Sequence, residues 1–215
     1  MRILLNGQEL HGIADTTATL GVALSAVQEQ FIDDDQVIAN INVDGEPLTA
    51  ERLAAWKGRP VGDFSEAHIE ALKRKQLAAH GLRLMAQGLA DSITDRNQIT
   101  DHLRQGRSDQ AMPLLNGYLQ VWYTAQQTIA GVARLLEINL DTVEVYSPCS
   151  SAETNAPQPL SQRIATLTEQ LSQLKAALQA GDFVLLGDIL DYEFDDLSEA
   201  WVEMFEQLAT RAEDS

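Results

Sequence analysis

The spacing of the apolar residues changes near residue 73, and this change constrains the fold more than any other feature of the chain. Before it, apolar residues recur at every second position, as they do at Ala39, Ile41 and Val43. After it, apolar residues recur at intervals of three and four, beginning with Leu82, Met85 and Leu89. A period of two is typical of strands with one buried face, and the longer period is typical of packed helices. The sequence therefore predicts an α+β protein with two domains, residues 1–72 and 73–215.

The first domain is predicted to have a β-grasp-like fold. Asn6 and Gly7 separate two short β-rich runs, and this pair of residues is the preferred sequence of a two-residue hairpin turn. A helix that Asp15 or Thr16 caps, with apolar positions from Leu20 to Phe31, follows the hairpin. A strand, a short helix ending at Trp56 and a last strand come after it. This order of elements is the one found in β-grasp folds.

The second domain is predicted to be an antiparallel four-helix bundle. Gly106 ends the first long helix, and the second begins at about Ser108. A polar loop at about residues 139–159 precedes the third helix. Gly181 is a typical helix end and Asp182 a typical N-cap, so the fourth helix must fold back directly against the third.

The formal net charge of −17, from 32 acidic and 15 basic side chains, argues against nucleic acid or an anionic membrane as a partner. No apolar run reaches the roughly 18–20 residues that a membrane span requires. The N-terminus has no signal-peptide core, and the lone Cys149 cannot form an intramolecular disulfide. We therefore expect a cytoplasmic protein.

The motifs of common catalytic and cofactor sites are absent: the phosphate-binding loops, HExxH, GxSxG and CxxC do not occur. We therefore predict no catalytic residue and no cofactor. The strongest metal-ligand candidates are Asp188, Asp191 and Asp195, whose spacing places them on one helix face. No Glu-x-x-His motif accompanies them, so a solvated acidic face is the favoured interpretation and no metal is predicted.

Two aromatic residues are candidates for contact with a protein partner. Tyr123 lies off the apolar positions of its helix, and Trp56 lies on a short amphipathic helix. Exposed aromatic side chains often anchor a partner in protein–protein interfaces.

Two stretches of the second domain resemble the flagellin export chaperones, a family of small helical bundles that wrap an extended flagellin segment. The first runs from Leu103 to Leu115, where a helix ends, a short turn follows and another helix begins. The second runs from Ala177 to Trp201 and resembles the final helix of that family. The front domain has no counterpart in those chaperones. The two-part layout also resembles uncharacterised bacterial proteins with a β-rich front and a helical rear, which implies only the fold.

These observations favour a non-enzymatic protein-binding or adaptor protein, with a chaperone-like role as one form of it. The identity of the protein partner and the process are left open. The alternative is a metal-binding protein or enzyme that uses the carboxylates of the last helix. A third interpretation is an assembly role in which the helices form a homodimer.

Overall fold

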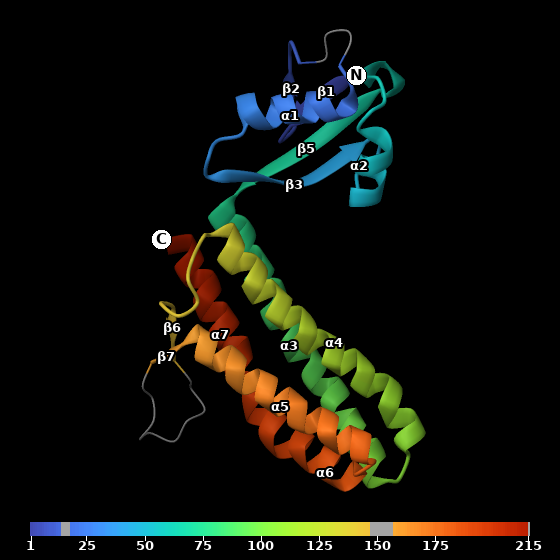
Figure 1. The fold of residues 1–215 in the computed structure, drawn as a ribbon, viewed down its shortest axis with the longest axis vertical. Helices are drawn as coiled ribbons and strands as arrows, with labels where there is room; N and C mark the ends of the chain where they lie inside the picture. Colours follow the sequence, from blue (N-terminus) through green and yellow to red (C-terminus); the bar gives the residue numbers. More distant parts are fainter. Residues whose placement is uncertain (14–17, 147–156, 215) are drawn as a thin grey trace. The chain divides into compact units, whose positions relative to one another are not determined.

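The computed structural model describes residues 1–13, 18–146 and 157–214. The protein is α+β, with a mixed sheet followed by helices (Figure 1). It divides into two compact units, Met1–Leu77 and Ala78–Ser215. Cys149 and the predicted helix caps Asp15 and Thr16 lie outside the described residues.

The N-terminal unit is built on a five-stranded sheet in the order β2-β1-β5-β3-β4. Strand β1 runs parallel to β5, and the other neighbouring strands are antiparallel. The elements are β1 (Arg2–Leu5), β2 (Gln8–Leu10), α1 (Leu20–Phe31), β3 (Gln36–Val43), β4 (Glu46–Pro47), α2 (Ala50–Trp56), a 3₁₀ turn η1 (Val61–Asp63) and β5 (Glu66–Lys73).

The predicted hairpin turn is present, with φ of 49° at Asn6 and 81° at Gly7. The side chain of Asn6 also extends the pairing of β1 with β5. Its Nδ2 donates to the Ala71 carbonyl at 3.1 Å, and its Oδ1 accepts from the Ala71 N–H at 2.9 Å. Helix α1 covers one face of the sheet and buries Leu20 and Val27 in the core of this unit.

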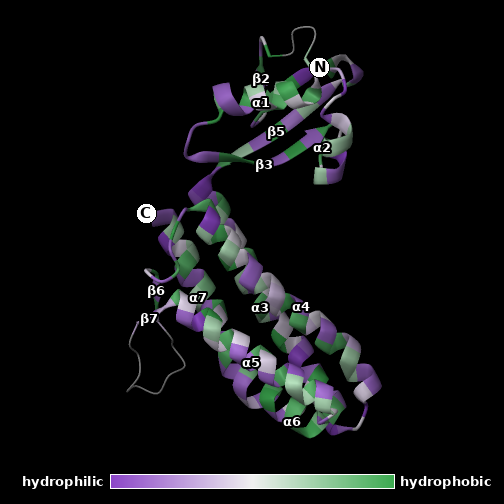
Figure 2. Cartoon of the chain, in the orientation of Figure 1, coloured by the Kyte–Doolittle hydropathy of each residue, from purple (hydrophilic) through white to green (hydrophobic). Residues whose placement is uncertain are grey.

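The second unit begins within the long helix that directly follows β5 and forms one hydrophobic core. Its elements are α3 (Arg74–Arg104), α4 (Ser108–Leu135), β6 (Glu144–Val145), β7 (Gln158–Pro159), α5 (Leu160–Ala180), α6 (Phe183–Asp188), a π-helical segment η2 (Ile189–Glu193) and α7 (Phe194–Asp214). Figure 2 shows hydrophobic and hydrophilic residues alternating along these helices. No helix in the described ranges is long and apolar enough to cross a membrane.

The predicted turns between the helices agree with the structure. Gly106 and Gly181 both have φ of 68°, a left-handed conformation that glycine adopts without strain. The Asp182 side chain accepts a hydrogen bond from the Leu185 N–H at 2.9 Å and so caps α6.

The predicted fourth helix is divided into α6, η2 and α7 in the structure, so a count of four helices is not confirmed. The Phe194 N–H donates to the carbonyl of Ile189, five residues earlier, so a π-helical turn separates α6 from α7. This wider turn allows Ile189, Leu190 and Phe194 all to be buried in the core. The apolar spacing alone did not reveal the extra residue in the turn.

Candidate functional site

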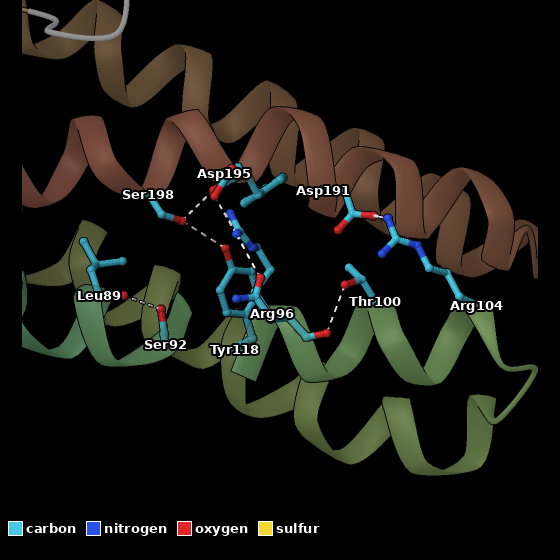
Figure 3. A network of polar contacts seen from close by, with 11 residues as sticks. Leu89, Ser92, Arg96, Thr100, Arg104, Tyr118, Asp191, Asp195 and Ser198 are labelled. Carbon is cyan, nitrogen blue, oxygen red and sulfur yellow. Dashed lines mark hydrogen bonds and ion pairs between the residues drawn. The ribbon is translucent and has the colours of Figure 1, made fainter. Parts of the chain in front are cut away.

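Two of the three predicted metal-ligand candidates form ion pairs with arginines of α3. The Nη2 of Arg96 lies 2.5 Å from Oδ1 of Asp195, and Arg104 pairs with Asp191 (Figure 3). Asp188 lies exposed on α6. Within the described ranges, no group of three or more His, Cys, Asp or Glu side chains is placed to hold a metal ion.

Arg96 is the most unusual charged residue of the second unit, because its side chain is only 5% exposed. Its Nη2 also donates to Asn97 Oδ1 at 3.0 Å, whereas Nε and Nη1 have no hydrogen-bond partner in the described part of the chain. A guanidinium group stays charged at any pH at which the protein folds. Asp195 therefore supplies the counter-charge for a buried cation.

Tyr118 and Ser198 lie beside this ion pair and connect α4 to α7 (Figure 3). The Ser198 hydroxyl donates to the Phe194 carbonyl at 2.6 Å, which leaves its oxygen free to accept from the Tyr118 hydroxyl at 3.3 Å. Burial raises the pKa of Tyr118, because the ionised form would lose its hydration. The phenol is therefore held neutral and acts as a hydrogen-bond donor.

Tyr118 also belongs to a cluster of aromatic rings with Trp122, Phe194 and Trp201. Trp122 packs edge-on against Tyr118, Phe194 and Trp201, with ring centroids 5.6–6.3 Å apart. The polar side chains pair with one another, Arg96 with Asp195 and Tyr118 with Ser198. The arrangement fixes α3, α4 and α7 against each other, and it contains no nucleophile activated by a histidine.

A groove of about 460 Å³ lies between α3 and α4. It is lined by Gly81, Leu84, Met85, Gly88, Gly117, Gln120, Val121, Thr124 and Thr128. A Cβ atom built on Gly81 or Gly117 would meet nothing within 4 Å. The glycines therefore leave open space that the packing of the two helices does not use.

A second exposed apolar region, the α6 surface, consists of Phe183, Val184, Leu185 and Tyr192. These side chains are 38%, 76%, 47% and 73% exposed. Asp182, Asp188 and Glu193 lie exposed in the same segment. The region thus combines apolar and acidic side chains.

The two predicted partner-binding aromatics differ in environment. Trp56 is half-buried against the core of the first unit, with its ring 5.6 Å from that of Phe64. The guanidinium of Arg52 covers it at 5.7 Å. Tyr123 is 56% exposed on α4, as expected.

Residues 93–204 match the model of a family described as a domain of unknown function (DUF8042), and this match covers more than half of the chain. The chain belongs to this family. Residues 1–73 match the model described as the TP0873 N-terminal domain. No curated protein and no solved structure shows a significant match. The DUF8042 match contains Arg96, Tyr118, Asp195 and Ser198 together with the whole α6 surface.

Proposed function

We propose that this protein is a non-enzymatic protein-binding or adaptor protein whose partner binds the α6 surface. The carrying observation is the exposure of Phe183, Val184, Leu185 and Tyr192 within one short segment. Large apolar side chains that are exposed close together in one segment are candidates for an interaction site.

The acidic residues of the same segment support a partner with basic as well as apolar side chains. Asp188 and Glu193 lie exposed between and beside the apolar residues. Opposite charge at the rim of an interface guides association and excludes partners of like charge. An amphipathic, basic segment of another protein fits this chemistry, and a chaperone-like role would be one use of it.

The alternative function, a metal-binding protein or enzyme that uses Asp188, Asp191 and Asp195, has weaker support. Arg96 and Arg104 each neutralise one of these carboxylates. A divalent ion would have to displace a guanidinium from a charge-assisted hydrogen bond. Elemental analysis of purified protein is the direct test, and a stoichiometric transition metal that is lost in Asp191→Asn would favour this alternative.

We further propose a β-grasp-like fold for the N-terminal domain and a bundle architecture for the second unit. The strand order and the parallel pairing of β1 with β5 support a β-grasp-like N-terminal domain. We describe the second unit as a four-helix bundle whose last member is interrupted by η2. A cytoplasmic location is consistent with the single cysteine of the sequence.

The partner site is tested by placing a photo-reactive amino acid at Val184 in the full chain. The matched control carries the same group at Ser172, an exposed position of α5. In an extract of the source organism we expect a discrete crosslinked product from position 184 only. Val184→Ser should then weaken binding of the purified partner at least tenfold, whereas Ser172→Ala should not. Equal crosslinking from both positions, or none from either, would contradict the proposed site.

A further inference from the structure

Helix α4 contains the longest charge-free run of the sequence. No charged residue and no histidine occurs from Gln110 to Ala133, between Asp109 and Arg134. Its solvent-facing side consists of exposed Gln110, Pro113, Asn116, Gly117, Gln120, Tyr123, Thr124, Gln127, Ala130 and Gly131. A helical face of this length without a charged side chain is unusual in a chain with a net charge of −17.

The groove beside this helix is more apolar than its residue types suggest. The Thr124 and Thr128 hydroxyls donate to the carbonyls of Gln120 and Thr124, each at 2.9 Å. The methyl groups are the parts of these side chains that remain for contact in the groove. Leu84 adds an aliphatic side chain that is 61% exposed.

The glycines of the groove lower the stability of their helices, and no contact within one copy of the chain requires them. Glycine inside a helix is about 1 kcal/mol less favourable than alanine. A Cβ would fit at Gly81 and Gly117 without a contact under 4 Å, and at Gly88 it would meet only the Met85 Cε at 3.6 Å. Glycine in such a position is suited to the close approach of another backbone.

We infer that the outward side of α4 and the adjoining groove bind a second copy of this chain, with the two α4 helices packed across a two-fold axis. This surface is separate from the α6 surface. Two copies with a net charge of −17 repel each other, so a stable contact between them needs a region without acidic side chains. A basic partner would instead be drawn to the acidic segments. The charge-free run is about 36 Å long at 1.5 Å per residue, which suffices for an extended helix pair.

The two-fold symmetry makes the inference testable by charge exchange at Gln120. This exposed groove residue lies near the middle of the charge-free run, so in an antiparallel pair it lies close to its own counterpart. We expect the wild-type full chain to sediment as a dimer, and Gln120→Glu and Gln120→Lys each to sediment as monomers. An equimolar mixture of the two variants should recover the dimer. The matched controls are Gln173→Glu and Gln173→Lys, on an exposed position of α5, which should leave the dimer unchanged.

A second variant separates dimerisation from folding. Gly117→Leu replaces a helical glycine at a site where the monomer has room, so its thermal stability at low protein concentration should be equal or higher. The added side chain should nevertheless reduce dimer affinity at least tenfold. A wild-type chain that remains monomeric at high micromolar concentration would overturn the inference. So would a dimer that tolerates both Gly117→Leu and the Gln120 variants. Photo-crosslinking at Val184 would be unaffected by either result, so the proposed function is tested independently.

Discussion

Helix α3 contacts the last helical segment through charged residues, whereas the outward side of α4 carries no charged residue from Gln110 to Ala133. Arg83, Arg96 and Arg104 of α3 pair with Glu213, Asp195 and Asp191, and we call these three pairs the ionic seam. Glu213 receives two hydrogen bonds from Arg83, at 2.5 and 2.7 Å. The uncharged residues Gln120 and Thr124 occupy the outward side of the neighbouring helix.

This difference shows where the chain places its acidic residues. In the ionic seam, cations of α3 offset carboxylates of α7 and η2, and the pairs help to align these elements over much of their length. On the outward side of α4, neither a cation nor a carboxylate occurs from Gln110 to Ala133. Charge is therefore used for contacts within the unit and is excluded from a surface suited to association with a second acidic chain.

The largest expected change in the free energy of unfolding comes from removing an aromatic ring that packs against the buried side of α4. Trp201 is 1% exposed and packs edge-on against Trp122, with centroids 5.7 Å apart. Trp201→Ala should destabilise the second unit by about 3–5 kcal/mol, the range for truncating a buried aromatic side chain. Tyr123→Ala, on the outward side of α4, should change the free energy of unfolding by less than about 0.5 kcal/mol. Denaturant unfolding of both variants tests this, and similar costs would show that the two sides do not differ.

Much of the fold could be predicted because its signals are local. The switch in apolar period, the Asn6–Gly7 turn and the helix ends at Gly106 and Gly181 each depend on a few adjacent residues. The π-helical turn could not be predicted, since it depends on how Ile189 and Phe194 pack against other helices. The spacing of apolar residues around this turn is compatible with a regular α-helix.

The site was only partly predictable, because its contacts join residues distant in sequence. The spacing identified Asp191 and Asp195, and Arg96 occupied a core position in the apolar pattern. Their pairing requires α3 to lie against the last helices, which no local pattern determines. A usable signal was nevertheless present: an arginine among apolar residues needs a carboxylate, and the acidic stripe on the last helix could supply one.

The second prediction concerns the buried cation of the ionic seam. Asp195→Asn removes the counter-charge of Arg96 and should destabilise the unit by about 1–2 kcal/mol, moderated by the 50% exposure of Asp195. Arg96→Met fills a similar volume without a charge and should cost less. The double variant should recover most of the loss caused by Asp195→Asn. A double-variant cycle in denaturant measures this, and a greater cost for Arg96→Met than for Asp195→Asn would contradict the assignment.

The third prediction concerns alkaline pH. The pKa of Tyr118 is raised by burial, so the folded state holds its phenolic proton more tightly than the unfolded state does. This contribution to stability is fully present below the unfolded tyrosine pKa of about 10 and is lost as pH rises through the folded pKa. The unfolding midpoint of the wild type should therefore fall more steeply above about pH 10 than that of Tyr118→Phe.

Absorbance titration of the tyrosinate checks the same prediction directly. The tyrosinate signal that is lost in Tyr118→Phe should appear in the wild type at a pH above the ordinary tyrosine pKa of about 10. Ionisation of Tyr118 at the ordinary tyrosine pKa of about 10 in the folded protein would contradict a buried, neutral phenol.

The smallest expected effect lies at the exposed end of the ionic seam. The hydrogen bonds from Arg83 lower the pKa of Glu213, so its folded-state pKa lies below the unfolded value of about 4.3. The stabilising contribution is present above the unfolded pKa and is lost as pH falls through the folded pKa. Because both side chains are more than 40% exposed, water and salt screen the pair. Glu213→Gln should therefore lower the unfolding midpoint slightly at neutral pH in low salt, and by less at acidic pH or in high salt.

Gln173→Glu, which adds a carboxylate on α5 away from this seam, should not reproduce that pattern. The difference in unfolding midpoint between the wild type and Glu213→Gln could instead be as large in acid and in high salt as it is at neutral pH in low salt. The Arg83–Glu213 contact would then act through packing of the side chains and not through charge.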